Sequence, residues 1–89
     1  MRAVITVVGK DSVGILAKVS AKCAESNVNV IEVTQSVLED MFCMIMLSDV
    51  SALNKSFGDF SDNMQQLGKE LNLSIHVMHE TIFNSMHRI

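Results

Sequence analysis

Aromatic side chains and clusters of basic residues are scarce in this chain of 89 residues. It has four Phe and neither Trp nor Tyr, and its seven Lys and Arg against ten Asp and Glu give a formal net charge of −3. Binding to a nucleic-acid backbone depends on grouped Lys and Arg, and RNA-reading sheets carry exposed aromatic residues on their strands. Nucleic acid is therefore not expected as a direct partner, and aliphatic and Met side chains must fill the core.

Paired cysteines, long apolar runs and a leader pattern are also missing. Cys23 and Cys43 lie twenty positions apart, a spacing that indicates neither a disulfide framework nor a zinc knuckle. We interpret both as core thiols. No uninterrupted apolar run approaches the roughly 20 residues of a membrane span, and the N-terminus lacks a signal-peptide pattern. We therefore expect a cytoplasmic protein that does not enter a membrane.

Residues that could carry catalysis or bind a metal do not assemble into a motif. His76, His79 and His87 could suggest a metal site, but His76 and His79 differ in parity, so on a regular strand they point to opposite faces. No acidic residue stands at a clear metal-ligand spacing in the sequence. Asp11 and Glu32 have neither a nucleophile nor a phosphate clamp beside them. We expect a protein that is not an enzyme and that uses neither a metal nor a cofactor.

Hydrophobic periodicity predicts the order strand, helix, strand, strand, helix, strand. We expect strands at about 2–8, 28–37, 41–47 and 73–79, a helix at 13–26, and a second helix capped by Ser48, Asp49 or Ser51, with Leu53, Phe57, Phe60, Met64, Leu67 and Leu71 as its core stripe. This order builds an α+β, ferredoxin-like sandwich, in which two helices cover one face of a four-stranded antiparallel sheet. We treat residues 1–89 as one domain, with a core at about 1–79 and a tail at about 80–89.

One face of such a sheet has no helices on it. The stretch Met41–Leu47 is apolar at every position, so both faces of that strand are expected to avoid water. A second copy of the chain is the simplest cover, and the tail at 81–89 is another. We predict a homodimer. The alternative is a monomer with an apolar sheet face and a self-folded tail.

The turn at Gly9–Leu16 is the most informative segment. It joins a β-branched strand directly to a helical pattern, so it opens a helix. Unpaired N–H groups and the positive end of the helix dipole converge there, and glycine lets a ligand approach the backbone, so a carboxylate or phosphate fits. The alternative is local: Asp11 or Ser12 caps the helix, and Gly14 relieves crowding.

These residues resemble an ACT domain, the small regulatory module that binds amino acids in many metabolic enzymes. The resemblance covers nearly the whole chain and is carried by the first strand, the turn at Gly9–Leu16 and the segment Asn27–Val30, while the tail ending Met86–Ile89 resembles small stand-alone single-ACT proteins. It implies that a ligand lies between the turn of one copy and the start of the second strand of the other. By position, it assigns ligand binding to Lys10, Asp11, Ser12, Val13, Gly14, Ile15 and Asn29.

Two residues of the turn depart from the pattern of this family. Serine-binding members have a neutral Asn where this chain has Asp11, and a carboxylate there repels the carboxylate of an amino acid. Two interpretations stay open: Asp11 holds the ammonium group of the ligand, or no amino acid binds and the module only dimerises. Val13 stands where many members carry a proline, so the turn is less rigid than usual.

We therefore expect a sensor without enzymatic activity. It would bind an amino acid or another small anionic metabolite at a homodimer interface and pass its occupancy to an unidentified protein partner. The alternative is a structural dimerisation module that binds no ligand. A thermal-shift screen against the common amino acids separates the two.

Overall fold

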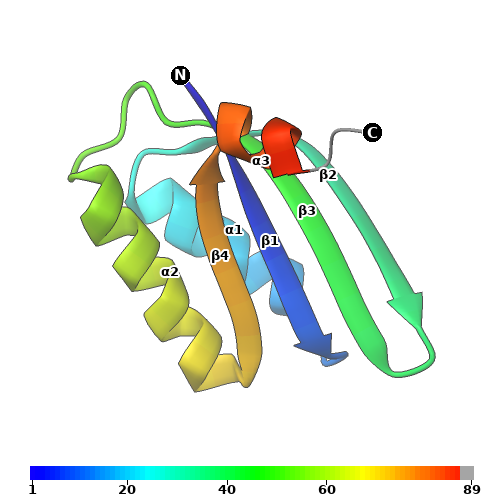
Figure 1. Cartoon of the computed structure of the whole chain (residues 1–89). Helices are drawn as coiled ribbons and strands as arrows, with labels where there is room; N and C mark the ends of the chain where they lie inside the picture. Colours follow the sequence, from blue (N-terminus) through cyan, green and yellow to red (C-terminus); the bar gives the residue numbers. More distant parts are fainter. Residues whose placement is uncertain (87–89) are drawn as a thin grey trace.

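The computed structural model describes residues 1–86, which fold into a four-stranded sheet with helices (Figure 1). The elements are β1 (Arg2–Lys10), α1 (Ile15–Glu25), β2 (Asn29–Leu38), β3 (Met41–Asp49), α2 (Phe57–Leu71), β4 (Leu73–His79) and α3 (Glu80–Met86). All three strand pairs of the sheet are antiparallel, in the order β2-β3-β1-β4. The predicted ferredoxin-like sandwich is confirmed. None of the helices formed by residues 1–86 has the length and apolarity to cross a membrane.

The core lies between the sheet and the two longer helices. Alternate residues of β1 and β3 point towards the helices and are buried, while their neighbours point to the opposite face. The helices contribute Ile15, Val19 and Cys23 from α1 and Phe60, Met64 and Leu67 from α2. The predicted core stripe is confirmed for α2, but Leu53 precedes the helix and packs against the core from the loop.

The start of α2 differs from the prediction. Ser56 is its N-cap, and the Ser56 hydroxyl accepts a hydrogen bond of 3.0 Å from the backbone N–H of Asp59. Ser48 instead lies in β3, where its buried hydroxyl donates to the carbonyl of Ala3 at 3.0 Å. The Asp49 carboxylate accepts from the backbone N–H of Ser51 at 2.8 Å. The three predicted caps were wrong because the end of β3 and the following turn already use these groups.

The two cysteines lie in different environments. Cys23 is buried under α1 as predicted, and burial raises the pKa of its thiol to about 11. The prediction of a core thiol was wrong for Cys43, which is half-buried on the opposite face of the sheet. The reason is strand parity: Cys43 lies opposite Val8 on one side and Ser36 on the other, and these residues point away from α1 and α2.

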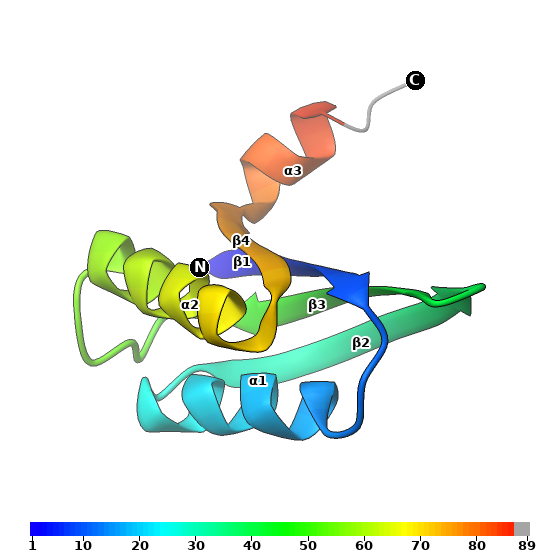
Figure 2. The ribbon, with the colours of Figure 1, turned by 90° about the horizontal axis from the view of Figure 1, so that it is seen from below.

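The segment after β4 forms α3, on the opposite side of the sheet from α1 (Figure 2). It packs against β1 and β4, and an ion pair of 2.6 Å joins Arg2 to Glu80. The sequence analysis did not predict a helix here. His87, together with the last two residues, lies outside the described residues.

The two histidines of β4 point to opposite faces, as predicted. His79 stacks on Phe57 of α2, with ring centroids 4.1 Å apart. His76 lies on the other face, where its Nε2 is 3.0 Å from the hydroxyl of Ser74. Both rings are accounted for by contacts with neighbouring side chains.

Candidate functional site

The turn between β1 and α1 presents the N-terminus of a helix without a side-chain cap. Gly14 is the N-cap residue, with φ 86° and ψ 11°, and its carbonyl accepts from the backbone N–H of Lys18 at 3.0 Å. No side chain of the described residues hydrogen-bonds to this cap. Capping by Asp11 or Ser12 was therefore wrong. Gly14, in a left-handed conformation that glycine adopts without strain, occupies the cap position itself.

The predicted ligand-binding residues of this turn fall into two groups. Lys10, Asp11, Ser12 and Gly14 are exposed, and the side chain of Val13 is 96% exposed. Ile15 is buried in the core and 3% exposed, so its side chain anchors the helix. Ile15 thus offers a ligand only its backbone N–H, whereas the four residues before Gly14 offer side chains.

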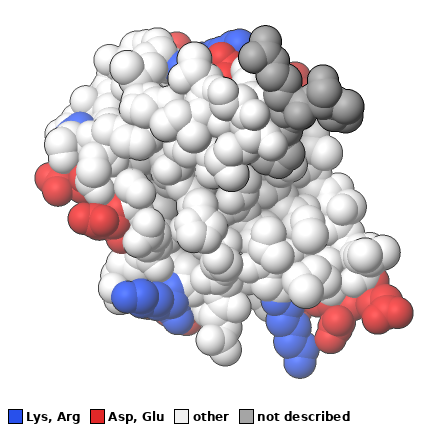
Figure 3. Space-filling view, in the orientation of Figure 1, with Lys and Arg blue, Asp and Glu red and all other residues white. Residues whose placement is uncertain are grey.

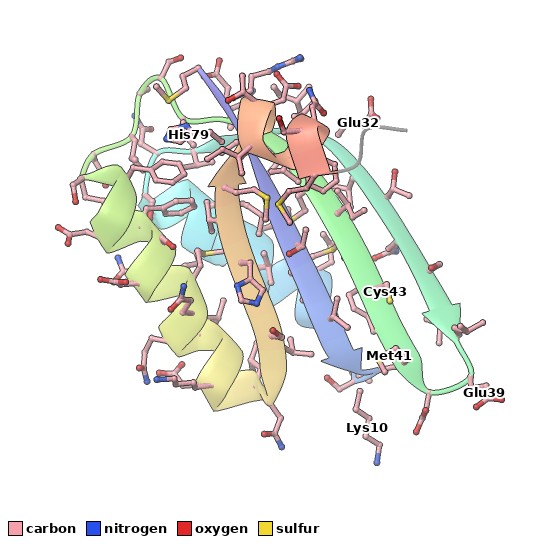
Figure 4. The ribbon with its side chains drawn as sticks, viewed as in Figure 1. Lys10, Glu32, Glu39, Met41, Cys43 and His79 are labelled. Carbon is pink, nitrogen blue, oxygen red and sulfur yellow. The ribbon has the colours of Figure 1, made fainter. Side chains whose placement is uncertain are left out.

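The tip of the hairpin between β2 and β3 supports the turn. The backbone N–H of Asp11 donates to the carbonyl of Asp40 at 2.8 Å. Figure 4 places Lys10, Glu39 and Met41 at this end of the sheet, and Glu39 has a φ of 61° in the two-residue connection. A fixed turn and an uncapped helix end therefore lie together at one end of the molecule.

Asn29 lies at the other end of the sheet. It stands opposite Asp49, which is also opposite Arg2, whereas Lys10 is opposite Met41. At a rise of ~3.3 Å per residue, the length of β1 separates these two ends by about 26 Å. A single chain does not bring Asn29 to the turn, so the two predicted parts of the site meet only if they come from different copies.

Three surface hollows of the described residues lie away from the turn. One, of about 490 Å³, lies between α2 and β4 and is lined by Gln65, Gly68, Lys69, Asn72, Leu73, Ser74, Ile75 and His76. Another, of about 360 Å³, includes Asn29 together with Asn27 and Ala52. The third, of about 300 Å³, lies at the N-terminus beside Arg2 and Glu80. Residues 10–15 line none of the three.

The sequence analysis missed the exposed edge of the sheet. Among residues 1–86, β2 pairs only with β3, and nearly all residues of β2 are exposed, among them Ile31, Val33, Val37 and Leu38. A β-bulge between Val30 and Glu32 shifts its register. An exposed edge with apolar side chains is a template for pairing with another strand. The sequence signal for it is weak, because β2 mixes apolar and polar residues without strict alternation.

The fold and this turn define the class of the protein. A family model described as ACT domain matches residues 2–78, and the chain belongs to the ACT domain family. Within that family its relatives are the small UPF0237 proteins. UPF0237 protein lin0537 of Listeria innocua is 45% identical over 89 residues, covering all of both chains. UPF0237 protein MJ1558 of Methanocaldococcus jannaschii is 39% identical over 88 residues, covering 99% of this chain and 98% of its own.

Solved structures share the same architecture. The ACT domain protein from Streptococcus pneumoniae superposes with a TM-score of 0.82 at 37% identity, covering 93% of each chain. A formyltetrahydrofolate deformylase from Pseudomonas syringae pv. tomato has a TM-score of 0.79 at 22% identity, and the match covers 88% of this chain but 27% of that one. The second likeness is one of fold alone.

Proposed function

We propose that this chain is a regulatory ACT domain that binds an amino acid, or a similar small anionic metabolite, at the boundary between two copies. The observation that carries the proposal is the exposed N-terminus of α1 at Gly14, where no side chain of the described residues caps the helix. The free N–H groups and the helix dipole favour a carboxylate at this position.

The exposed edge strand supports a boundary of this kind. If β2 pairs antiparallel with β2 of a second copy around a twofold axis, the start of each strand comes to lie beside the end of the other. The start of β2 carries Asn29, and its end lies at the hairpin tip that supports the turn. This pairing brings the partner's Asn29 towards Gly14, which a single chain cannot do.

The chemistry of the assembled groups suits a zwitterion. The N–H groups at the start of α1 and the Lys10 ammonium favour the ligand's carboxylate, and the Asp11 carboxylate favours its ammonium group. The partner's Asn29 supplies an amide that both donates and accepts hydrogen bonds. A ligand held by both copies binds the paired state more tightly than the separate one, so its occupancy shifts the association equilibrium. A partner protein that distinguishes these states would receive the signal.

A thermal-shift and calorimetric screen against the common amino acids tests this proposal. A ligand at 100 times its dissociation constant stabilises the native state by ~2.7 kcal/mol. Asn29→Ala and Asp11→Asn are expected to weaken the affinity by about ten-fold each, in line with the loss of one hydrogen bond or charge contact. Asp62→Asn removes a carboxylate from α2, far from the turn, and serves as the matched control.

A module that only dimerises is the second candidate. It is favoured by the apolar residues exposed on β2 and on the face of the sheet opposite α1 and α2. If no amino acid raises the melting temperature at millimolar concentration, this candidate replaces the first.

A further inference from the structure

The sheet has an open face, formed by the residues that point away from α1 and α2. From cross-strand pairing they are Glu32, Thr34 and Ser36 of β2, Cys43, Ile45 and Leu47 of β3, Val4, Thr6 and Val8 of β1, and Ser74, His76 and Met78 of β4. Of these twelve side chains only Glu32, on the edge strand β2, carries a formal charge. Figure 3 views the molecule from this side, and the charged side chains lie at its rim.

The helix α3 covers only one half of the open face. Figure 1 shows it crossing the sheet near the start of β1, where Val4 is 3% exposed. Further along the strands the cover ends, and Val8 and Ile45 are 40% and 44% exposed. The uncovered half therefore comprises the rows of Thr6 and Val8 with their neighbours on β3 and β4.

The outer side of α3 is apolar as well. Ile82 is 51% exposed and Met86 is 66% exposed. The Arg2–Glu80 ion pair fixes the start of this helix above β1, so the helix adds apolar side chains beside an apolar, half-covered sheet. The patch is thus continuous from α3 to the uncovered half of the face.

We infer that the open face binds a second copy of this chain, with α3 of each copy packing on the half that the other leaves uncovered. A twofold axis in the plane between two facing sheets, perpendicular to the strands, exchanges the two ends of the face. Each α3 then lies on the partner's uncovered rows, and Ile82 and Met86 are buried between the sheets.

The chemistry of the face fits an identical partner. In a twofold interface the same patch faces itself, so a charged patch would repel its own copy. Here the three inner strands contribute no formal charge to the face, and the Arg2 and Glu80 charges at its covered end neutralise each other within one copy. Glu32 lies on the edge strand in the row of Val4, and the twofold axis places that row opposite the partner's uncharged Val8 and Ser36 row, so the two Glu32 side chains do not face each other. Four strands ~4.8 Å apart and about nine residues long cover roughly 19 by 30 Å, of the same order as the ~800 Å² per partner of a standard interface.

This contact is independent of the one proposed for ligand binding. The edge of β2 pairs through its backbone, whereas the open face packs through side chains of all four strands. Both contacts can form in one assembly. If experiment shows that one contact does not form, the other proposal is unaffected, so each contact is tested by its own experiment.

Cys43 gives a direct test because its sulfur lies on the half of the open face that α3 leaves uncovered (Figure 4). Full-length protein is treated with a small maleimide over a range of protein concentrations, and each cysteine is followed by peptide mass spectrometry. Modification of Cys43 is expected to slow by about ten-fold or more once most chains are assembled, because the thiol then reacts only in the free fraction. Cys23 is the internal control, since it is buried and its pKa is raised to about 11.

Charge insertion on the contact completes the test. Ile82→Lys on α3 and Ile45→Lys on the sheet are each expected to abolish the protection of Cys43, while Gln66→Lys on the exposed side of α2 preserves it. Asn29→Ala also preserves it, whatever its effect on ligand binding. Circular dichroism confirms that each variant is folded. The inference would be overturned if Cys43 were modified at the same rate at every protein concentration. This holds whether light scattering then shows monomers or assembled chains.

Discussion

At the scale of the residue, a few backbone conformations position the candidate site. The left-handed residues are Gly14, Asn27, Glu39 and Asn72, and each ends a strand or helix or begins the next. The sequence predicted a first helix that ends at residue 26, and in the structure α1 ends at Glu25 and is followed by Asn27 in the left-handed conformation, which Asn tolerates. It did not predict that Gly14 is the cap, because a glycine two residues after Ser12 suits both a side-chain cap and a left-handed cap.

Alanine substitutions at two glycines are expected to change the free energy of unfolding in opposite directions. A Cβ added at Gly14 meets only the Lys18 Cε at 3.9 Å, and a Cβ added at Gly58 meets nothing within 4 Å, so neither substitution is crowded. Only Gly14 has a positive φ. Gly14→Ala is therefore expected to lower the free energy of unfolding by ~1–2 kcal/mol, and Gly58→Ala, in the first turn of α2, to raise it by ~0.5–1 kcal/mol.

Urea denaturation of both variants measures these changes. Equal stability of Gly14→Ala and the parent protein would show that the turn adopts another conformation in solution. The helix end would then not present its N–H groups as described.

At the scale of the element, hydrophobic periodicity was sufficient wherever a helix or strand buries one face. It predicted the four strands, α1 and the core stripe of α2, because burial in a small domain selects these patterns. Periodicity failed where local polar groups determine the residue at which a helix begins. The loop before α2 contains several possible caps, and hydrogen bonds from distant parts of the chain determine which one is used. The short α3 has no buried side chain to produce a periodic signal.

The cap of α2 gives the element-scale prediction. Ser56→Ala is expected to lower the free energy of unfolding by about 1 kcal/mol, because the backbone N–H of Asp59 loses its acceptor. Ser51→Ala is the control: its hydroxyl accepts from the exposed N-terminal amine at 2.8 Å, and the loss is expected to stay within ~0.5 kcal/mol. Thermal and urea unfolding of the pair measure the difference. A larger loss for Ser51→Ala would place the start of α2 earlier in the chain.

At the scale of the whole molecule, the sequence located the turn of the candidate site but not how a second part of the chain could join it. The turn is local and could be found from the strand, the glycines and the following helix. Asn29 could be assigned to the site only by resemblance, because the fold puts it at the end of the sheet away from the turn. The exposed edge of β2 and the half-covered open face depend on strand order and on α3, which no local pattern encodes.

The two proposed contacts predict the mass of the assembly and its response to ligand. With both contacts formed and their two twofold axes perpendicular and intersecting, the assembly closes into a tetramer, and four chains of 9.8 kDa give a particle of about 39 kDa. Val33→Lys places a charge on the exposed edge of β2, and Ile45→Lys places one on the open face, so each alone is expected to give dimers and the two together monomers. Sedimentation measures the masses, with Gln66→Lys as the control.

Only the edge variant is expected to lose its thermal response to an amino acid, since the proposed ligand site needs the partner's Asn29. A full response in Val33→Lys would place the site within one chain, and an unchanged mass in Ile45→Lys would leave the open face without a second copy.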